Sequence, residues 1–582
     1  MRFLPLFLFF FISSLAQEVP PVTNYDSKEY EASNQNWMLS QGEDKHIYVA
    51  NNSGLLEFTG EQWNLYRVPD ESSVRSVHAS GKRIYTGAHM DFGYWDRNST
   101  GCLEYHSLKD SVAQGMFDGE QFWHIKEVNN YVIFQSHQRL YSYNVKTNKV
   151  STIVTEDNIS NLFRIKNKIY YQVAEKGLFS IESGTGKLFI SNTQLKGKSI
   201  VGLFPFARDK MLAVTRDNGL FTIEGNHWKS FPLKDYPISK SFFNSLYLQD
   251  GTLVLGSIGG GLYIINLKTA EEHHLSQPTI LNNTVLAIME DSAGNIWGGL
   301  DNGLTVINID SPFRLFSDTF GHIGTVYCSY RLGDLMYLGT NQGLYYNKTG
   351  SDWPYKLVPG TSGQVWSINY VNDKLYIGHD RGTFLVNGAS ASHIWEGLGT
   401  WTVKSIGDGL LQGHYNGITY INVNTKEGNS QYLKNFDLSS RNIVVQNDSV
   451  IWVGHYHKGV YRLKLTRDYT RIEEIKNYKV PAEVWEGLQV FEFNDTIYYS
   501  TERAIYKYLP QSDKFTVDNE LNRLTQGQKR TSGTSEVLKD GTWWSFGEDN
   551  LYYVTVDDLE QKLVRRSVPL PLEYRSVAEG FE

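Results

Sequence analysis

The chain has 582 residues, 41% of them hydrophobic and 14% aromatic, and its formal net charge is −8. This length exceeds what one hydrophobic core supports, so we expect more than one domain. The acidic balance and the lack of a basic run exclude a nucleic-acid-binding surface, which needs clustered Lys and Arg. The 51 glycines and many aromatic residues predict an all-β fold of short strands and tight turns. Cys102 and Cys328 are too far apart for a metal-ligand motif or a disulfide framework.

The first residues have the pattern of a secretory signal peptide. An apolar run begins at the third residue, and Ser14 and Ala16 supply the small residues of a cleavage site before Gln17. The run is too short to span a bilayer comfortably, and an uncleaved anchor is the alternative. We therefore predict a signal peptide over residues 1–16 and a periplasmic or extracytoplasmic location for the mature chain.

A repeat of roughly forty residues follows and continues along the chain. Its clearest copy parses into three strands, Thr284–Glu290, Asn295–Leu300 and Leu304–Ile309, joined by hairpin turns that contain Gly and Asn. Similar second-strand motifs recur throughout. They begin at His46, Arg83, Tyr131, Lys168, Met211, Thr252, Asn295, Leu335, Lys374, Leu410, Val450, Thr496 and Trp543.

Each copy gains an outer strand from the segment that connects it to the next copy, for example Gln62–Val68 and His227–Leu233. Four strands per repeat predict the blades of a β-propeller, in which a closed ring of sheets protects the strand edges. A leucine-rich solenoid needs a shorter period, and helical repeats need a 3.6-residue periodicity that this chain does not have.

Thirteen blades are too many for one ring, so we predict two consecutive seven-bladed β-propellers. We assign residues 17–33 to an N-terminal segment, residues 34–315 to the first propeller and residues 316–582 to the second. The last blade is predicted to be truncated, because Arg575–Glu582 resembles only the first strand of a blade. We therefore expect the sequence to be the N-terminal part of a longer protein.

The repeat closely resembles that of the two-component regulator propeller family. The segment Gly294–Asn308, "GNIWGGLDNGLTVIN", carries the resemblance best, and the copies at Leu335 and Val450 are variants of it. The opening Tyr25–Trp63 also looks like the start of that family's sensor region, and the resemblance extends over nearly the whole mature chain.

The resemblance implies a periplasmic ligand-sensing region of a transmembrane signalling receptor or transcriptional regulator. It implies two seven-bladed propellers, an oligosaccharide ligand bound without catalysis, and a kinase or helix-turn-helix output encoded further on. Contact with the membrane would come only through a C-terminal segment beyond this sequence, and the full receptor could be a homodimer. Two alternatives remain open: a secreted propeller enzyme that acts on polysaccharide, either a lyase or a glycosidase, or an extracellular protein-binding scaffold.

Three adjacent blades place a histidine at one equivalent position, at the end of the second strand: His379, His414 and His455. One interpretation is an arc of ligand contacts on one rim of the second propeller. The other is that the position needs a polar group to bond the following turn, since Thr340 occupies it in the preceding blade. Neighbouring blades hold such residues too far apart for zinc ligands, so we expect no metal and no cofactor.

Aromatic residues near the same rim could stack on sugar faces, although most aromatic residues of a propeller pack in its core. The candidates are Trp401, Tyr415 and Tyr456. The sequence has no nucleophile elbow, zinc-protease motif, phosphate loop or dinucleotide fingerprint. Carboxylate pairs for glycoside hydrolysis are set in space, so the sequence leaves that chemistry open. We predict no catalytic residues and no enzymatic activity for this segment.

Overall fold

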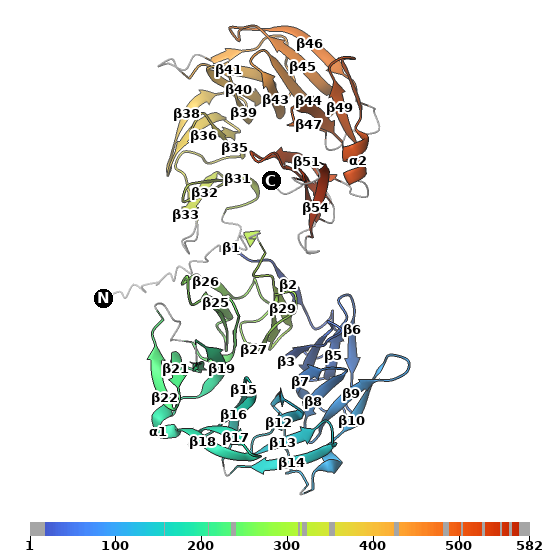
Figure 1. The fold of residues 1–582 in the computed structure, drawn as a ribbon. Coiled ribbons are helices and arrows are strands. Elements are labelled where there is room, and N and C mark those ends of the chain that lie inside the picture. Colours follow the sequence, from blue (N-terminus) through green and yellow to red (C-terminus); the bar gives the residue numbers. More distant parts are fainter. Residues whose placement is uncertain are drawn as a thin grey trace, which may run out of the picture. The chain divides into compact units, whose positions relative to one another are not determined.

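The computed structural model separates the chain into two compact units, one over Val19–Leu315 and one that contains Phe316 and the residues after it. Figure 1 shows both as rings of small sheets. The structure describes residues 18–113, 115–155, 157–207, 209–233, 240–311, 315–316, 323–348, 355–423, 430–480, 488–501, 504–525, 530–547, 550–557 and 562–569. The predicted signal peptide, residues 1–16, and the predicted partial blade at Arg575–Glu582 lie outside these ranges.

The described residues form thirteen four-stranded antiparallel sheets; twelve are meanders of consecutive strands, and one takes its outer strand from the start of the chain. This confirms the predicted all-β propeller fold, and each predicted second strand is the second strand of a sheet. Three short helices, η1 (Lys109–Ser111), α1 (Asn192–Leu195) and α2 (Asn519–Thr525), lie in connections between strands. A two-stranded sheet joins β1 (Glu18–Val19) to β30 (Leu315–Phe316).

The first propeller contains seven blades, here numbered 1 to 7 in chain order. Their strands are β3 (Asn36–Gln41), β4 (Ile47–Asn51), β5 (Gly54–Phe58) and β6 (Trp63–Tyr66); β7 (Val74–Ser80), β8 (Arg83–Ala88), β9 (Phe92–Arg97) and β10 (Leu103–Ser107); β11 (His124–Val128), β12 (Tyr131–Gln135), β13 (Arg139–Asn144) and β14 (Lys149–Val154); β15 (Ile159–Ile165), β16 (Lys168–Val173), β17 (Gly177–Glu182) and β18 (Thr185–Ser191); β19 (Ile200–Phe206), β20 (Lys210–Thr215), β21 (Leu220–Glu224) and β22 (His227–Phe231); β23 (Phe242–Tyr247), β24 (Thr252–Ser257), β25 (Leu262–Asn266) and β26 (Glu272–Leu275); β27 (Val285–Glu290), β28 (Ile296–Leu300), β29 (Leu304–Ile307) and β2 (Val22–Tyr25).

The N-terminal strand closes this ring. β2 pairs antiparallel with β29 as the outer strand of blade 7, with Val22 opposite Ile307 and Tyr25 opposite Leu304. Val22 is 2% exposed, because this pairing buries it in the hydrophobic cluster between blades 6 and 7. The sequence interpretation left residues 17–33 outside the propeller, since a strand whose partner lies more than 250 residues away has no local signal. The first strands of adjacent blades contact one another around the ring, and β27 meets β3.

Six blades of the second propeller are described, numbered 8 to 13. Their strands are β31 (Val326–Leu332), β32 (Leu335–Thr340), β33 (Leu344–Lys348) and β34 (Lys356–Leu357); β35 (Val365–Val371), β36 (Lys374–His379), β37 (Gly382–Asn387) and β38 (Ser390–Glu396); β39 (Thr400–Ile406), β40 (Gly409–His414), β41 (Gly417–Ile421) and β42 (Ser430–Tyr432); β43 (Asn442–Asn447), β44 (Val450–His455), β45 (Gly459–Leu465) and β46 (Ile472–Tyr478); β47 (Gln489–Phe493), β48 (Thr496–Ser500), β49 (Ile505–Leu509) and β50 (Lys514–Val517); β51 (Arg530–Val537), β52 (Trp543–Gly547), β53 (Asn550–Val556) and β54 (Leu563–Pro569).

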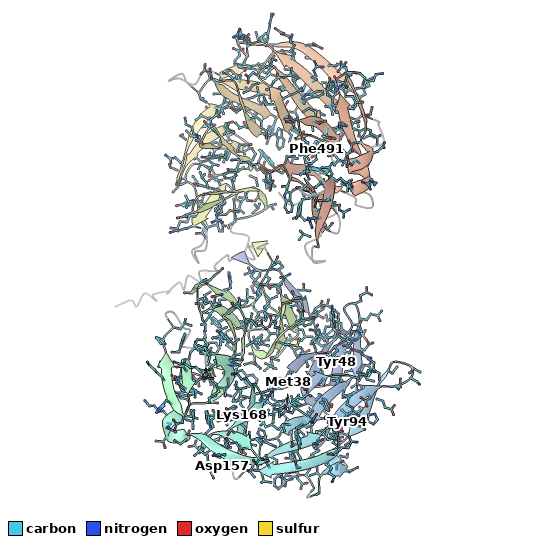
Figure 2. The ribbon with its side chains drawn as sticks, in the orientation of Figure 1. Met38, Tyr48, Tyr94, Asp157, Lys168 and Phe491 are labelled. Atoms are coloured by element: carbon cyan, nitrogen blue, oxygen red, sulfur yellow. The ribbon has the colours of Figure 1, made fainter. Side chains whose placement is uncertain are left out.

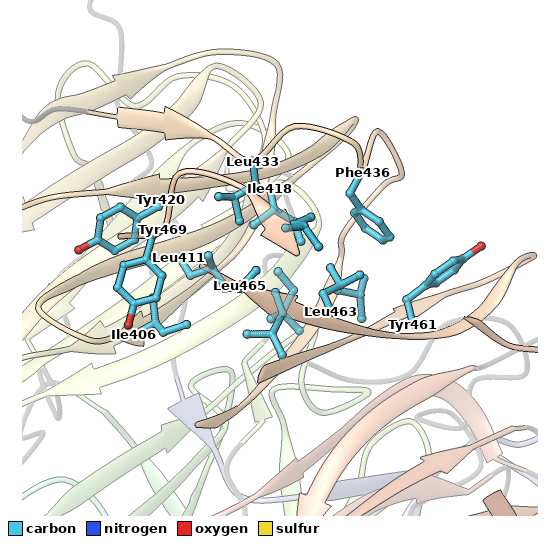
Figure 3. Close-up of a cluster of buried hydrophobic side chains, with 14 residues drawn as sticks. Ile406, Leu411, Ile418, Tyr420, Leu433, Phe436, Tyr461, Leu463, Leu465 and Tyr469 are labelled. Carbon is cyan, nitrogen blue, oxygen red and sulfur yellow. The ribbon is translucent and has the colours of Figure 1, made fainter. Parts of the chain in front are cut away.

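The hydrophobic core lies between the blades, where the apolar face of one sheet packs on the next. Figure 3 shows the cluster between blades 10 and 11, in which Leu411 and Ile418 pack with Ile451 and Leu463. All four side chains are fully buried, and each contributes about 1.5–3 kcal/mol to folding by leaving water. Because each blade needs a neighbour on both faces, such clusters recur between successive blades.

A glycine near the end of the second strand lets the next blade approach. A Cβ atom on Gly299 would lie 2.7 Å from the carbonyl oxygen of Asn36, in the first strand of the neighbouring blade. A Cβ on Gly378 or Gly413 would overlap the carbonyl oxygen of Thr400 or Ser440 in the same way. Since a backbone atom cannot swing aside as a side chain can, this position of the repeat requires glycine in these blades.

Candidate ligand-binding rim of the second propeller

The three predicted histidines end the second strands of adjacent blades, where β36, β40 and β44 lead into their turns. His379 and His414 are 0% and 2% exposed, so neither ring has surface to offer a ligand, whereas His455 is partly exposed. His379 Nε2 hydrogen-bonds with the carbonyl oxygen of Thr361 (3.1 Å), and its Nδ1 accepts from the Arg381 N–H (3.1 Å).

The other two histidines bond their own turns as well. His414 Nδ1 hydrogen-bonds with Asn416 Oδ1 (3.0 Å), and its Nε2 hydrogen-bonds with Thr419 Oγ1 (3.0 Å). His455 Nδ1 accepts from the N–H of His457 (3.1 Å). Each imidazole therefore holds the turn that follows its strand.

At the equivalent position of other blades, a threonine hydroxyl forms the same kind of hydrogen bond to the turn. The Thr340 hydroxyl accepts from the Gln342 N–H (3.0 Å) and donates to the carbonyl oxygen of Gly343 (3.0 Å). In the first propeller, the Thr215 hydroxyl donates to the carbonyl oxygen of Gly219 (2.7 Å). The shared feature of this position is a hydrogen bond to the turn, which an imidazole and a hydroxyl both supply.

The surroundings of the three histidines lower the pKa of each imidazole. Burial lowers the pKa of His379, although the Asp380 carboxylate 2.5 Å from Nδ1 opposes this effect. Burial also lowers the pKa of His414, and burial together with the neighbouring Lys458 charge lowers that of His455. The lowered pKa values favour the uncharged imidazole at neutral pH, and for His379 and His455 this agrees with an Nδ1 that accepts a backbone N–H.

Two of the predicted aromatic residues lie together, and a third that was not predicted joins them. The ring centroids of Trp401 and Tyr415 are 4.8 Å apart, and Trp366 lies 4.9 Å from Trp401. Trp366 Nε1 donates to the Tyr415 hydroxyl (2.8 Å). Tyr456, 37% exposed on the next turn, has its ring 6.5 Å from that of His457. The sequence could have indicated Trp366, because this residue lies at the same position of its blade's first strand as Trp401 does.

Among the described residues, one cluster resembles a metal site, and it lies in the first propeller. Ligand atoms of Asp44, His46 and Glu57 lie within 4.8 Å of one another. Arg97, from blade 2, forms ion pairs with both carboxylates. Tyr48, labelled in Figure 2, donates to Asp44 Oδ2 (2.8 Å). The guanidinium thus occupies the place that a cation would take, and the cluster ties blade 2 to blade 1.

This ion-pair cluster sets the charge of its buried carboxylate. Glu57 is 1% exposed. Burial alone would raise its pKa, but hydrogen bonds with Arg97, His46 and Tyr66 hold the pKa below its ordinary value. Glu57 is consequently ionised at neutral pH, and Arg97 neutralises it.

No protein-family model matches this chain, and no curated protein matches its sequence. Its structure is similar to the extracellular domain of the putative hybrid two component system BT3049 from B. thetaiotaomicron. The TM-score is 0.70 at 14% sequence identity, over 94% of this chain and 78% of that one. The two chains share a fold.

A second structural neighbour also comes from B. thetaiotaomicron. The extracellular domain of the putative one component system BT4673 from B. thetaiotaomicron covers 97% of this chain and 80% of its own, at 15% identity and a TM-score of 0.41. Extracellular domains of such systems are therefore among the structural neighbours of this chain, in agreement with the resemblance of its repeats. Within the described ranges, no helix has the length and hydropathy of a membrane-spanning segment.

Proposed function

We propose that this chain is the extracytoplasmic ligand-sensing region of a transmembrane signalling receptor, and that it binds an oligosaccharide without converting it. The observation that supports this function is the likeness of 94% of the chain, at a TM-score of 0.70, to an extracellular domain of a putative hybrid two component system. The family resemblance of the repeats supports the saccharide as the class of ligand.

Signalling by such a region requires no chemistry. A bound saccharide changes the output only if its affinity differs between two conformations of the receptor, and each tenfold difference shifts their equilibrium by about 1.4 kcal/mol. Among the six predicted contact residues, Trp401 and Tyr415 are the ones for which we propose ligand contact. They lie together and are partly exposed, whereas His379 and His414 are buried in their turns.

Calorimetric titration of residues 17–582 with a panel of defined hexasaccharides tests this function. The panel contains β-1,4-glucan, β-1,3-glucan, β-1,4-xylan, β-1,4-mannan, α-1,5-arabinan and α-1,4-galacturonan fragments. We expect one class to bind with micromolar affinity and to be recovered intact after prolonged incubation. New reducing ends or unsaturated products would instead identify an enzyme, and the absence of binding to every fragment would contradict the proposed saccharide sensing.

A further inference from the structure

The first strands of blades 8 to 10, and the residue just before the first strand of blade 11, each present one side chain at an equivalent place on the same rim. In each blade, the residue that pairs with the second-strand glycine is preceded by a large side chain: Tyr327, Trp366, Trp401 or Arg441. In blades 8 to 10 the strand register shifts at this residue, so it lies in a β-bulge. A bulge leaves its extra residue out of the ladder and re-aims the side chain.

These side chains form one continuous row across four blades, which we call the aromatic row. The ring centroids of Tyr327 and Trp366 are 4.9 Å apart at an interplanar angle of 25°, and those of Trp366 and Trp401 are 4.9 Å apart at 48°. The Arg441 guanidinium lies 5.3 Å from the centroid of Trp401 and extends the row. The strands that carry or adjoin it, β31, β35, β39 and β43, are successive neighbours around the ring (Figure 1).

Hydrogen bonds fix the row and satisfy its polar edges. Trp366 Nε1 donates to the Tyr415 hydroxyl (2.8 Å), and Trp401 Nε1 donates to Ser439 Oγ (3.1 Å). Both indoles are nevertheless partly exposed. Rings that are held in place, with their N–H groups already bonded, lose little entropy when a ligand stacks on them.

Charged groups flank the row on two sides. Arg441 is exposed beside Trp401. Asp380 lies on the side of Tyr415: its carbonyl oxygen accepts from the N–H of Gly399 (2.9 Å), Gly399 packs against the Tyr415 ring, and the Asp380 side chain is 36% exposed. A guanidinium donates hydrogen bonds and a carboxylate accepts them, so the two together match the hydroxyl groups around a sugar ring.

The first propeller provides an internal comparison. Its equivalent positions in blades 1 to 3 are Trp37, Arg75 and Trp123. The Arg75 guanidinium lies 4.3 Å from the ring centroid of Trp37 and 5.5 Å from that of Trp123, and it donates to Asn52 Oδ1 (2.8 Å). In the first propeller one guanidinium packs on both tryptophans, whereas in the second propeller Trp366 and Trp401 are adjacent and the Arg441 guanidinium packs on Trp401 alone, at the end of the row.

We propose that the aromatic row is the saccharide-binding site of the second propeller. Successive pyranose rings of a single oligosaccharide stack on Trp366 and Trp401, while Arg441 and Asp380 bond their hydroxyl groups. This inference rests on the proposed function and adds to it the place and mode of binding. It places the ligand on the bulged residues Trp366 and Trp401, next to Tyr415.

The test is calorimetric and tryptophan-fluorescence titration of residues 17–582 with the hexasaccharide that binds in the panel above. We expect Trp366→Leu and Trp401→Leu each to weaken binding at least thirtyfold, on the order of a central aromatic contact. The matched control is Trp37→Leu, at the equivalent position of the first propeller, which should leave the affinity unchanged. Arg441 is exposed, so Arg441→Gln should leave the blade folded. This change should weaken saccharide binding about tenfold.

The outcomes separate this site from the proposed function. If the wild-type chain binds a hexasaccharide and all of the row variants bind it equally well, the site is wrong and the function stands. Loss of binding in Trp37→Leu to the same extent as in Trp366→Leu would also contradict the site. A wild-type chain that binds no fragment contradicts the function and this site with it.

Discussion

Replacing Gly413 by Ala tests the close approach between blades 10 and 11. The added Cβ would overlap the carbonyl oxygen of Ser440, a backbone atom at the start of the next blade. The same residue donates its N–H to the carbonyl oxygen of His414 (3.1 Å), so moving the chain away to relieve the overlap also weakens that bond.

The expected loss can be estimated from these two effects. Overpacking a well-packed contact costs about 1–3 kcal/mol, and the weakened hydrogen bond adds about 1 kcal/mol. Alanine also lowers the conformational entropy of the unfolded chain, which stabilises the folded protein by about 0.4–1 kcal/mol. We expect a net loss of about 2–3 kcal/mol, which lowers the unfolding midpoint of the second propeller by about 4–12 °C.

Gly454 supplies the matched control, one blade further on. There the nearest atoms to an added Cβ would be Asn442 Oδ1 at 3.0 Å and the Leu488 side chain at 3.1 Å, which can rotate away. Gly454→Ala should therefore change stability by less than about 1 kcal/mol. Differential scanning calorimetry of both variants measures their unfolding midpoints and tests this difference. Equal losses at the two positions would refute the argument that the neighbouring backbone imposes glycine.

Three further predictions concern charge, pH and ring closure. Arg97→Met leaves the buried Glu57 carboxylate without its cation and should cost the first propeller about 1–3 kcal/mol in denaturant unfolding. Because the folded pKa of Glu57 is lowered, this loss should be present above the unfolded pKa of roughly 4.3 and disappear as the pH falls through the folded value; a loss that does not depend on pH would contradict the assignment. The folded pKa of His414 is lowered by burial, so the unfolded state binds more protons below roughly pH 6.5, and the second propeller should lose stability as the pH falls. His414→Gln should flatten that dependence. A chain that starts at Asp26 lacks β2 and should unfold earlier in the first propeller only, whereas an unchanged midpoint would show that ring closure does not depend on β2.

The family resemblance and the fold were accessible from the sequence because the repeat is local. Each hairpin lies within about fifteen residues and is marked by Gly and Asn at its turns, so the thirteen second strands could be located one by one. Gly378 and Gly413 precede the histidines of their blades, and the sequence interpretation assigned them no role. The reason for glycine there, a carbonyl oxygen of the next blade, became clear only in three dimensions.

The tertiary structure decided which of the conspicuous residues are available to a ligand. The sequence marked His379, His414 and His455 as equivalent, and the structure places the first two in buried turns. It brings Trp366 beside Trp401, two residues that are 35 positions apart in the chain. Side chains of different blades meet only after the ring has formed, so no sequence window contains that row.

What the sequence by itself determined is the repeating unit, because strand pairing within a blade depends on short-range turns and on alternating side chains. What only the tertiary structure decided is every contact that crosses from blade to blade. The pairing of β2 with β29, the ion pair of Arg97 with Glu57 and the aromatic row all join residues whose separation in the chain carries no signal. The physical reason is that the packing of one blade on the next, and for β2 the closure of the first ring, brings these groups together, and local propensity does not.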